Sequence, residues 1–249
     1  MKSGRPIDLC FSQEGGVFPG TNYVILGDPG IGKSTLLFEH AGDIHSTGRR
    51  VLFVQCEMNR IDLYGYTKRF EKLGSIPFLF MADHAGDDSD VKKVIERALE
   101  PGWDLVYIDS STELVEDLME QGMSRRKAES WLIDTMILHN EGNNQANLFT
   151  SFLLISQVNK GGSFVGTNKW KHNTTGMLEL RYTDKVETER AVLVKKNRRG
   201  FAYGRLPFEV KTTELVYHEG LVLAEREREI KEFESDTFWS IEATFEKAG

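Results

Sequence analysis

The sequence lacks any apolar run near the roughly 18 to 20 residues that a membrane-spanning helix needs. It also lacks a secretory signal at its start, because Pro6 and Asp8 follow Lys2 and Arg5 where an apolar segment would be required. We therefore predict no membrane partner and a cytoplasmic location.

Cysteine and histidine are too few and too scattered for a metal cluster or a disulfide framework. Cys10 and Cys56 are the only two cysteines of the chain, and they are far apart. The six histidines are scattered, and none of them forms a His-x-x-x-His pair or sits beside a cysteine. A metal ion is therefore expected only together with a bound nucleotide.

Acidic residues outnumber basic residues in the whole sequence, but many of the basic residues cluster late in the chain. The formal net charge is -7, and the pI is about 5.5. An evenly acidic surface would disfavour nucleic acid, whose binding needs cations against phosphates. The basic residues that cluster late are Lys160, Lys169, Lys171, Lys195, Lys196, Arg198, Arg199 and Arg205.

What the sequence does have is a regular alternation of apolar strands and helices. The expected strands cover residues 22–27, 51–56, 77–81, 105–109 and 152–156, and the expected helices cover about 60–73, 91–99 and 126–139. Such near-continuous apolar strands between helices are typical of an α/β domain with a mainly parallel sheet covered on both faces.

The sequence pattern changes after Gly176, where short candidate strands follow one another with few residues between them. The segments MLELRY, RAVLVKK, RLPFEV and ELVYH predict antiparallel hairpins. We expect one core over residues 1–224 and a charged helical tail over residues 225–249.

Residues 27–34 fit the phosphate-binding pattern G-x-x-x-x-G-K-[ST] between a predicted strand and a predicted helix. Backbone N–H groups of such a loop point at phosphate oxygens, and glycines leave the room that this requires. Lys33 would contact the β- and γ-phosphates of ATP, and Ser34 would coordinate Mg²⁺. The alternative is a glycine-rich turn that caps a helix. The predicted nucleotide-binding residues are Gly27, Asp28, Pro29, Gly30, Ile31, Gly32, Lys33, Ser34 and Thr35.

Two carboxylates follow neighbouring predicted strands. Asp109 ends the strand 105–109, at the edge of a parallel sheet where the phosphate loop also lies, so it is the predicted second Mg²⁺ ligand. Glu57 follows the strand 51–56 and is the predicted catalytic base for the attacking water. A structural aspartate and a solvated charge at a helix start are the alternatives.

The order of these motifs resembles the RecA/DnaB superfamily of ATPases. The segments GGVFPGTNYVILGDPGIGKSTLL and KKNRRG look most like the RadA/Sms branch, and the likeness runs from about Gly15 to Gly220. The resemblance implies a RecA-like P-loop NTPase core that binds ATP with Mg²⁺. It also implies that Gln157 is a polar sensor of the γ-phosphate.

The resemblance further implies two DNA-binding loops, at residues 116–126 and 159–172. Lysines there can neutralise phosphates, and Phe164 or Trp170 could stack on bases. The alternative for the second loop is a hairpin with solvated lysines and a buried tryptophan. The predicted DNA-binding residues are Lys160, Phe164, Lys169, Trp170, Lys171, Arg125, Arg126 and Arg199.

Residues 196–200, KNRRG, resemble a basic signature of RadA and the basic pair that RecA proteins insert into a neighbour's ATP site. The resemblance implies that Lys196 and Arg198 act in catalysis across a subunit boundary. The alternative is a basic hairpin turn that does not extend into any ATP site. Arg199 could equally face DNA.

The four-cysteine zinc module and the protease-like domain of full RadA/Sms proteins are not in this sequence. The chain thus resembles the core-only recombination proteins of some bacteriophages, which would place it in the host cytoplasm. We predict an ATPase, stimulated by single-stranded DNA, that forms a hexameric ring or a filament and promotes annealing or strand exchange in recombination and repair. A DnaB-like hexameric helicase and a nucleotide-dependent switch without DNA are the alternatives.

Overall fold

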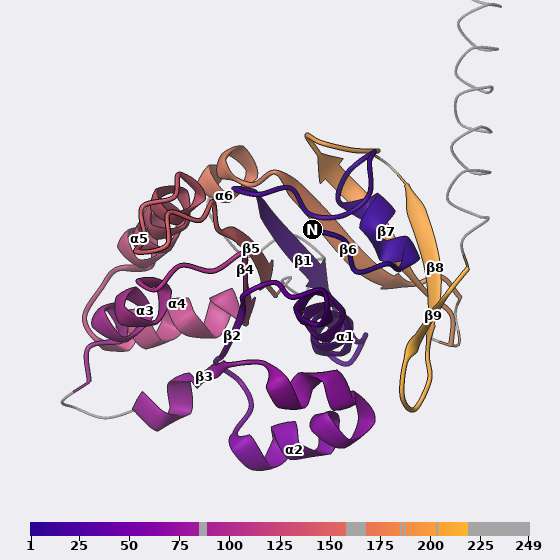
Figure 1. Cartoon of the computed structure of the whole chain (residues 1–249), viewed down its shortest axis with the longest axis horizontal. Helices are drawn as coiled ribbons and strands as arrows, with labels where there is room; N and C mark the ends of the chain where they lie inside the picture. The colour runs from indigo at the N-terminus through magenta and orange to yellow at the C-terminus, as the bar shows by residue number, and fades with distance from the viewer. Residues whose placement is uncertain (85–88, 158–167, 185, 187, 203, 219–249) are drawn as a thin grey trace, which may run out of the picture.

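The computed structural model describes residues 1–84, 89–157, 168–184, 186, 188–202 and 204–218. In this part of the chain the strands form one nine-stranded sheet in the order β3-β2-β4-β5-β1-β6-β7-β8-β9 (Figure 1). The predicted tail at residues 225–249, and with it the boundary between core and tail, lies outside the described residues.

Six strands run parallel, and three antiparallel strands extend the sheet at one side. The parallel strands are β1 (Asn22–Gly27), β2 (Val51–Gln55), β3 (Phe78–Phe80), β4 (Leu105–Asp109), β5 (Ser151–Ile155) and β6 (Gly176–Tyr182). The antiparallel strands are β7 (Arg190–Asn197), β8 (Arg205–Val210) and β9 (Leu215–Tyr217). The mainly parallel sheet with late antiparallel strands confirms the predicted fold class, although β6, expected among the hairpins, pairs parallel with β1.

Helices cover both faces of the sheet (Figure 1). One face packs against α1 (Lys33–Ser46), α2 (Arg60–Arg69) and η2 (Glu71–Ser75), and the other against α3 (Val91–Leu99), α4 (Ser111–Glu120) and α5 (Arg125–Asn140). The shorter helices are η1 (Pro6–Cys10), η3 (Met81–His84) and α6 (Asn168–Asn173). None of the helices in the described part of the chain combines the length and the apolar character of a membrane span.

Two separate apolar cores result from the alternation of side chains along the strands. On β4, Leu105 and Tyr107 belong to the core beneath α1, whereas Val106 and Ile108 belong to the core beneath α3, α4 and α5. Because both faces of β4 are buried, every one of its residues is shielded from water. This explains why the parallel strands are near-continuous apolar runs, with polar residues mainly at their ends.

Helix α4 corrects the predicted first DNA loop. Residues 116–120 lie in this helix, and only residues 121–124 connect it to α5. The helix forms because the Ser110 side chain accepts a hydrogen bond from the Glu113 N–H, and because Leu114, Val115 and Leu118 are buried along one stripe.

A buried polar group lies between α1 and β4. The Nδ1 atom of His40 is 2.6 Å from the hydroxyl oxygen of Tyr107, and its Nε2 atom is 4.0 Å from an oxygen of Asp8. Burial lowers the pKa of His40 from 6.5 to about 4, although the charges of Asp8 and Asp43 act in the opposite direction. His40 is therefore neutral in the folded protein at pH 7.

Acidification should destabilise the protein through His40. Because the folded-state pKa lies below the unfolded one, the unfolded chain binds the proton first, and stability is lost as the pH falls from about 6.5 towards 4. Between pH 7 and 4.5 we expect this residue to lower the free energy of unfolding by about 2 to 3 kcal/mol. Urea unfolding of the wild type and of His40→Gln at both pH values measures it, and equal losses in the two proteins would contradict the assignment.

Candidate nucleotide site

The phosphate-binding loop connects the end of β1 to the start of α1. Gly30 has φ +79° and Gly32 has φ +106°, in the left-handed region that side chains rarely adopt. A Cβ on Gly27 would lie 2.7 Å from the carbonyl oxygen of Leu180 on β6. Glycine is therefore required both to turn the loop and to let it approach the neighbouring strand.

A cavity of about 250 Å³ lies above this loop, at the carboxyl edge of the parallel strands. It brings together residues from four strand ends and from α1 and α2, including the predicted Lys33, Ser34, Thr35, Glu57, Asp109 and Gln157. The other lining residues are Pro29, Gly30, Gly32, Tyr66 and Ile155.

The side chain of Lys33 folds back onto the phosphate-binding loop that precedes it. Its ammonium group donates hydrogen bonds to the carbonyl oxygens of Gly27 at 2.8 Å and Asp28 at 2.9 Å. Burial lowers the pKa of Lys33, whereas the charges of Glu57 and Asp109 act in the opposite direction. The positive charge is thus held by backbone oxygens within the cavity and faces two carboxylates.

Asp109 is an almost fully buried carboxylate, 1% exposed, at the end of β4. Among the described residues neither of its oxygens accepts a hydrogen bond of normal geometry. Burial raises the pKa of Asp109 to about 6, and the nearby Ser34 hydroxyl and Gln55 amide act to lower it. A buried carboxylate without partners is costly unless a cation accompanies it.

These residues fit a Mg²⁺ ion. Asp109 and Ser34 offer oxygen atoms, the ligand type that Mg²⁺ prefers, and Mg²⁺ in phosphate sites is commonly held by few protein ligands. In the described ranges no group of three or more His, Cys, Asp or Glu residues could hold a metal. The remaining ligands of an ion at this place would therefore be phosphate and water oxygens.

Glu57 reaches the cavity from the turn between β2 and α2, and its side chain is exposed. The turn is fixed because the N–H groups of Glu57 and Met58 donate to Oε1 of Gln55, at 2.9 and 3.2 Å. The next residue, Asn59, caps α2 by accepting from two N–H groups of its first turn. Glu57 thus stands on a well-supported turn, open to water.

The basic turn at residues 196–200 lies far from the phosphate loop of its own chain. Asn197 is in register with Gly176 on β6, which in turn is in register with Tyr23 near the start of β1. Gly27, where the loop begins, is four residues further, or about 13 Å along the strand. The ammonium group of Lys196 donates to the Thr174 carbonyl at 2.6 Å, and Arg198 donates to the His172 carbonyl at 2.6 Å.

The predicted DNA-binding residues are only partly brought together. Arg125 and Trp170 line one small cavity between α4, α5 and α6, and Arg126 is exposed at the start of α5. Arg199 does not line this cavity, and its guanidinium lies 5.4 Å from the ring centre of Phe18. Lys171 belongs to α6, whereas Lys160 and Phe164 lie outside the described residues.

Two of these residues are engaged inside the protein. Trp170 is only 3% exposed and packs in the core beneath α5, so the prediction that it stacks on bases is wrong for this conformation. Lys169 donates to Ser130 at 2.6 Å and pairs with Asp134 at 3.1 Å on α5. The buried side chain and this ion pair hold α6 against α5.

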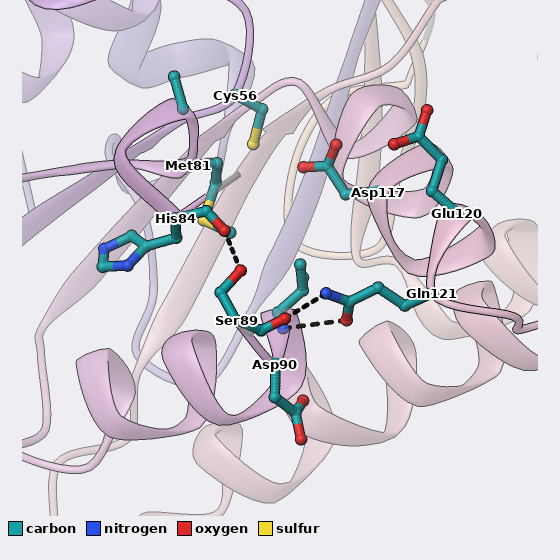
Figure 2. A pocket seen from close by; sticks show the side chains of 10 residues that line it. Cys56, Met81, His84, Ser89, Asp90, Asp117, Glu120 and Gln121 are labelled. Carbon is teal, nitrogen blue, oxygen red and sulfur yellow. Dashed lines mark hydrogen bonds between the residues drawn. The ribbon is translucent and has the colours of Figure 1, made fainter. Parts of the chain in front are cut away.

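A larger cavity of about 670 Å³ lies on the face of the sheet that α3, α4 and α5 cover. It is lined by residues of η3, α3 and α4 (Figure 2). Its wall carries the carboxylates of Asp90, Asp117 and Glu120, which would repel a triphosphate. Burial, with the charge of Glu120, raises the pKa of Asp117. Cys56 points into this cavity, and burial raises the pKa of its thiol well above the usual value.

The sequence patterns did not single out Gln55 or Tyr66. Gln55 is 0% exposed at the end of β2, and Tyr66 lines the nucleotide cavity from α2. A polar residue at the end of an otherwise apolar strand was the available signal for Gln55. No comparable signal marked Tyr66.

No family model matches the chain. Its sequence is similar to DNA repair protein RadA from Mycobacterium tuberculosis, with 28% identity over 199 residues, 76% of this chain and 37% of that protein. RadA from Halalkalibacterium halodurans is 27% identical over 81% of this chain and 41% of its own length. RadA from Streptococcus pneumoniae is also 27% identical, over 81% of this chain and 45% of its own length. The chain spans less than half the length of these relatives.

Solved structures share the fold at low sequence identity. The crystal structure of a KaiC-like protein from Pyrococcus horikoshii superposes with a TM-score of 0.63 and 21% identity, covering 88% of this chain and 98% of that one. The flagellar accessory protein FlaH from Methanocaldococcus jannaschii superposes with a TM-score of 0.56 and 14% sequence identity. The match covers 82% of this chain and 92% of that one. These likenesses confirm the RecA-type fold, and the RadA matches confirm the resemblance read from the motifs.

Proposed function

Because the chain has the RecA-type fold and its sequence is related to the RadA repair proteins, we propose that it is an ATPase of DNA recombination and repair. It binds ATP with Mg²⁺, assembles as an oligomer on single-stranded DNA and promotes annealing or strand exchange. The observation that carries this proposal is the cavity in which Lys33, Asp109 and Glu57 meet above the phosphate loop.

The charged and hydroxyl groups of the cavity divide three chemical tasks between them. The N–H groups of the loop and the Lys33 ammonium neutralise phosphate charge and orient the terminal phosphate. Ser34 and Asp109 would hold Mg²⁺, which would supply further charge neutralisation at the phosphates. Glu57 orients a water molecule and accepts its proton on a carboxylate oxygen.

The position of the basic turn supports an oligomer. Lys196 and Arg198 lie at the amino edge of the parallel strands, whereas the cavity lies at the carboxyl edge. They therefore act only on the site of another copy, whose carboxyl edge faces this amino edge. Such a head-to-tail contact is heterologous, and repeating it gives a ring or a filament.

DNA binding is best supported around the start of α5. Arg125 pairs with Glu116 of α4, while Arg126 and Lys127 are exposed side by side in the first turn of the helix. The predicted second DNA loop ends in α6, which packs against α5. The start of α5 and the described end of the second predicted DNA segment thus lie together, as a strand passing over them would require.

Single-stranded DNA should raise the rate of ATP hydrolysis, and its binding should depend steeply on salt. If four phosphates are contacted, affinity falls by about 50-fold between 50 and 200 mM salt, because counterions are released. Fluorescence anisotropy of a labelled oligonucleotide and phosphate release measure the two effects. Arg126→Ala should weaken binding and flatten the salt slope, whereas Lys93→Ala on α3 should change neither.

Other outcomes select the competing functions. No DNA binding even at low salt would favour a nucleotide-dependent switch, which the net charge of -7 also favours. Unwinding of a forked duplex would favour a helicase. Unchanged turnover across a range of DNA lengths would remove the proposed DNA-dependent activity.

A further inference from the structure

Gln55 lies side by side with the proposed metal ligand Asp109. The two residues are in register on the adjacent parallel strands β2 and β4, and the Cys56 N–H donates to the Asp109 carbonyl at 2.7 Å. Side chains of such partners point to the same face and lie about 5 Å apart at their Cβ atoms. Phe53 and Tyr107, two residues earlier on the same strands, pack in the core beneath α1, so by the alternation of side chains Gln55 and Asp109 belong to that face, and both are buried.

The amide of Gln55 can have only one orientation. Its Oε1 accepts hydrogen bonds from two backbone donors, the N–H groups of Glu57 and Met58. The NH₂ group could not replace the oxygen there, because donors would then face donors. The Nε2 atom therefore points away from the turn.

That Nε2 atom is buried and, among the described residues, has no hydrogen-bond partner. The same holds for both oxygens of Asp109 beside it. A buried donor and a buried acceptor, both unsatisfied and held on neighbouring strands, are an arrangement that proteins rarely keep without use. The Gln55 amide, like the Ser34 hydroxyl, already acts to lower the pKa of the Asp109 carboxyl, so the two side chains lie within interaction range.

We infer that Gln55 is a positioning residue that joins the two halves of the site. Its oxygen fixes the turn that carries Glu57, and its amide donates to the Asp109 carboxylate and orients the latter for the cation. This inference rests on the proposed function. Residues that orient metal ligands by hydrogen bonds typically contribute 10- to 100-fold in metal affinity or activity.

The test measures Mg²⁺ rather than turnover alone. Binding of a fluorescent ATP analogue is titrated with Mg²⁺ in the wild type, in Gln55→Met and in Cys56→Ala. Met has a similar volume but neither donor nor acceptor, so we expect half-saturation to need 10- to 100-fold more Mg²⁺. Cys56 borders Gln55 but faces the other side of the sheet, so Cys56→Ala should titrate like the wild type.

A folded Gln55→Met protein with the wild-type Mg²⁺ dependence would overturn the inference. If circular dichroism shows that this variant does not fold, Gln55→Asn takes its place, since it keeps the amide but withdraws it by one methylene group. Unchanged Mg²⁺ dependence there would be equally decisive against the role. If the wild type does not bind the analogue at any Mg²⁺ concentration, the proposed ATPase function fails instead.

Discussion

Lys33→Ala should lower ATP turnover by about 100- to 1000-fold or more, the loss usual when a preorganised charge at the reacting centre is removed. The ammonium group sits between the backbone oxygens of Gly27 and Asp28, within the cavity that Glu57 and Asp109 also line. Its replacement leaves the phosphate loop without its only lysine. Phosphate release with saturating ATP and Mg²⁺ measures the effect.

The control for this variant is a lysine on the same side of the molecule that does not line the cavity. Lys68 on α2 lies with its ammonium group 4.5 Å from the ring centre of Tyr64, on the surface. Lys68→Ala should keep the wild-type rate. Turnover at the full rate in Lys33→Ala would show that the loop does not hold the hydrolysed nucleotide.

The phosphate loop and the parallel strands were predictable because their determinants are local. The pattern from Gly27 to Ser34 needs glycines at fixed positions, and the structure shows left-handed backbone at Gly30 and Gly32. Strands buried on both faces are apolar in nearly every position except at their ends, so β1 and β4 were predicted with the bounds that the structure has. The placement of Asp109 and Glu57 beside the loop then follows from parallel pairing.

What could not be predicted depends on contacts between distant segments. Trp170 stands among lysines and glycines, so the sequence left open whether it stacks on bases or is buried, and only its contacts with α5 and α4 bury it. Residues 116–120 read as part of a loop, yet the cap at Ser110 and the core beneath α4 make them helical. The direction of β6 was hidden for a similar reason, since a strand pattern carries no information about which neighbour it joins.

Lys196→Ala should lower turnover by about 10³- to 10⁵-fold, as the loss of a cationic finger does, while binding of ATP is retained. The reason is geometric, because the turn is at the strand edge opposite to its own phosphate loop and can serve only a neighbour. Arg198→Ala should have an effect of the same kind. A nucleotide-binding assay beside a phosphate-release assay separates this result from that of Lys33→Ala.

A loss of turnover alone would not exclude a structural role, because Lys196 also ties β7 to the Thr174 carbonyl. Mixing the two inactive proteins distinguishes the roles. In an oligomer of Lys33→Ala and Lys196→Ala subunits, some sites combine an intact loop from one protein with an intact finger from the other. For random head-to-tail assembly of equal amounts, these are about a quarter of all sites.

The mixture should therefore regain about a quarter of the wild-type rate, whereas each protein alone stays inactive. A mixture of Lys33→Ala with the double variant Lys33→Ala/Lys196→Ala contains no intact loop and should remain inactive. If Lys196 only anchors β7 within its own subunit, no mixture recovers activity. Recovery would thus require that the finger of one subunit completes the site of the next.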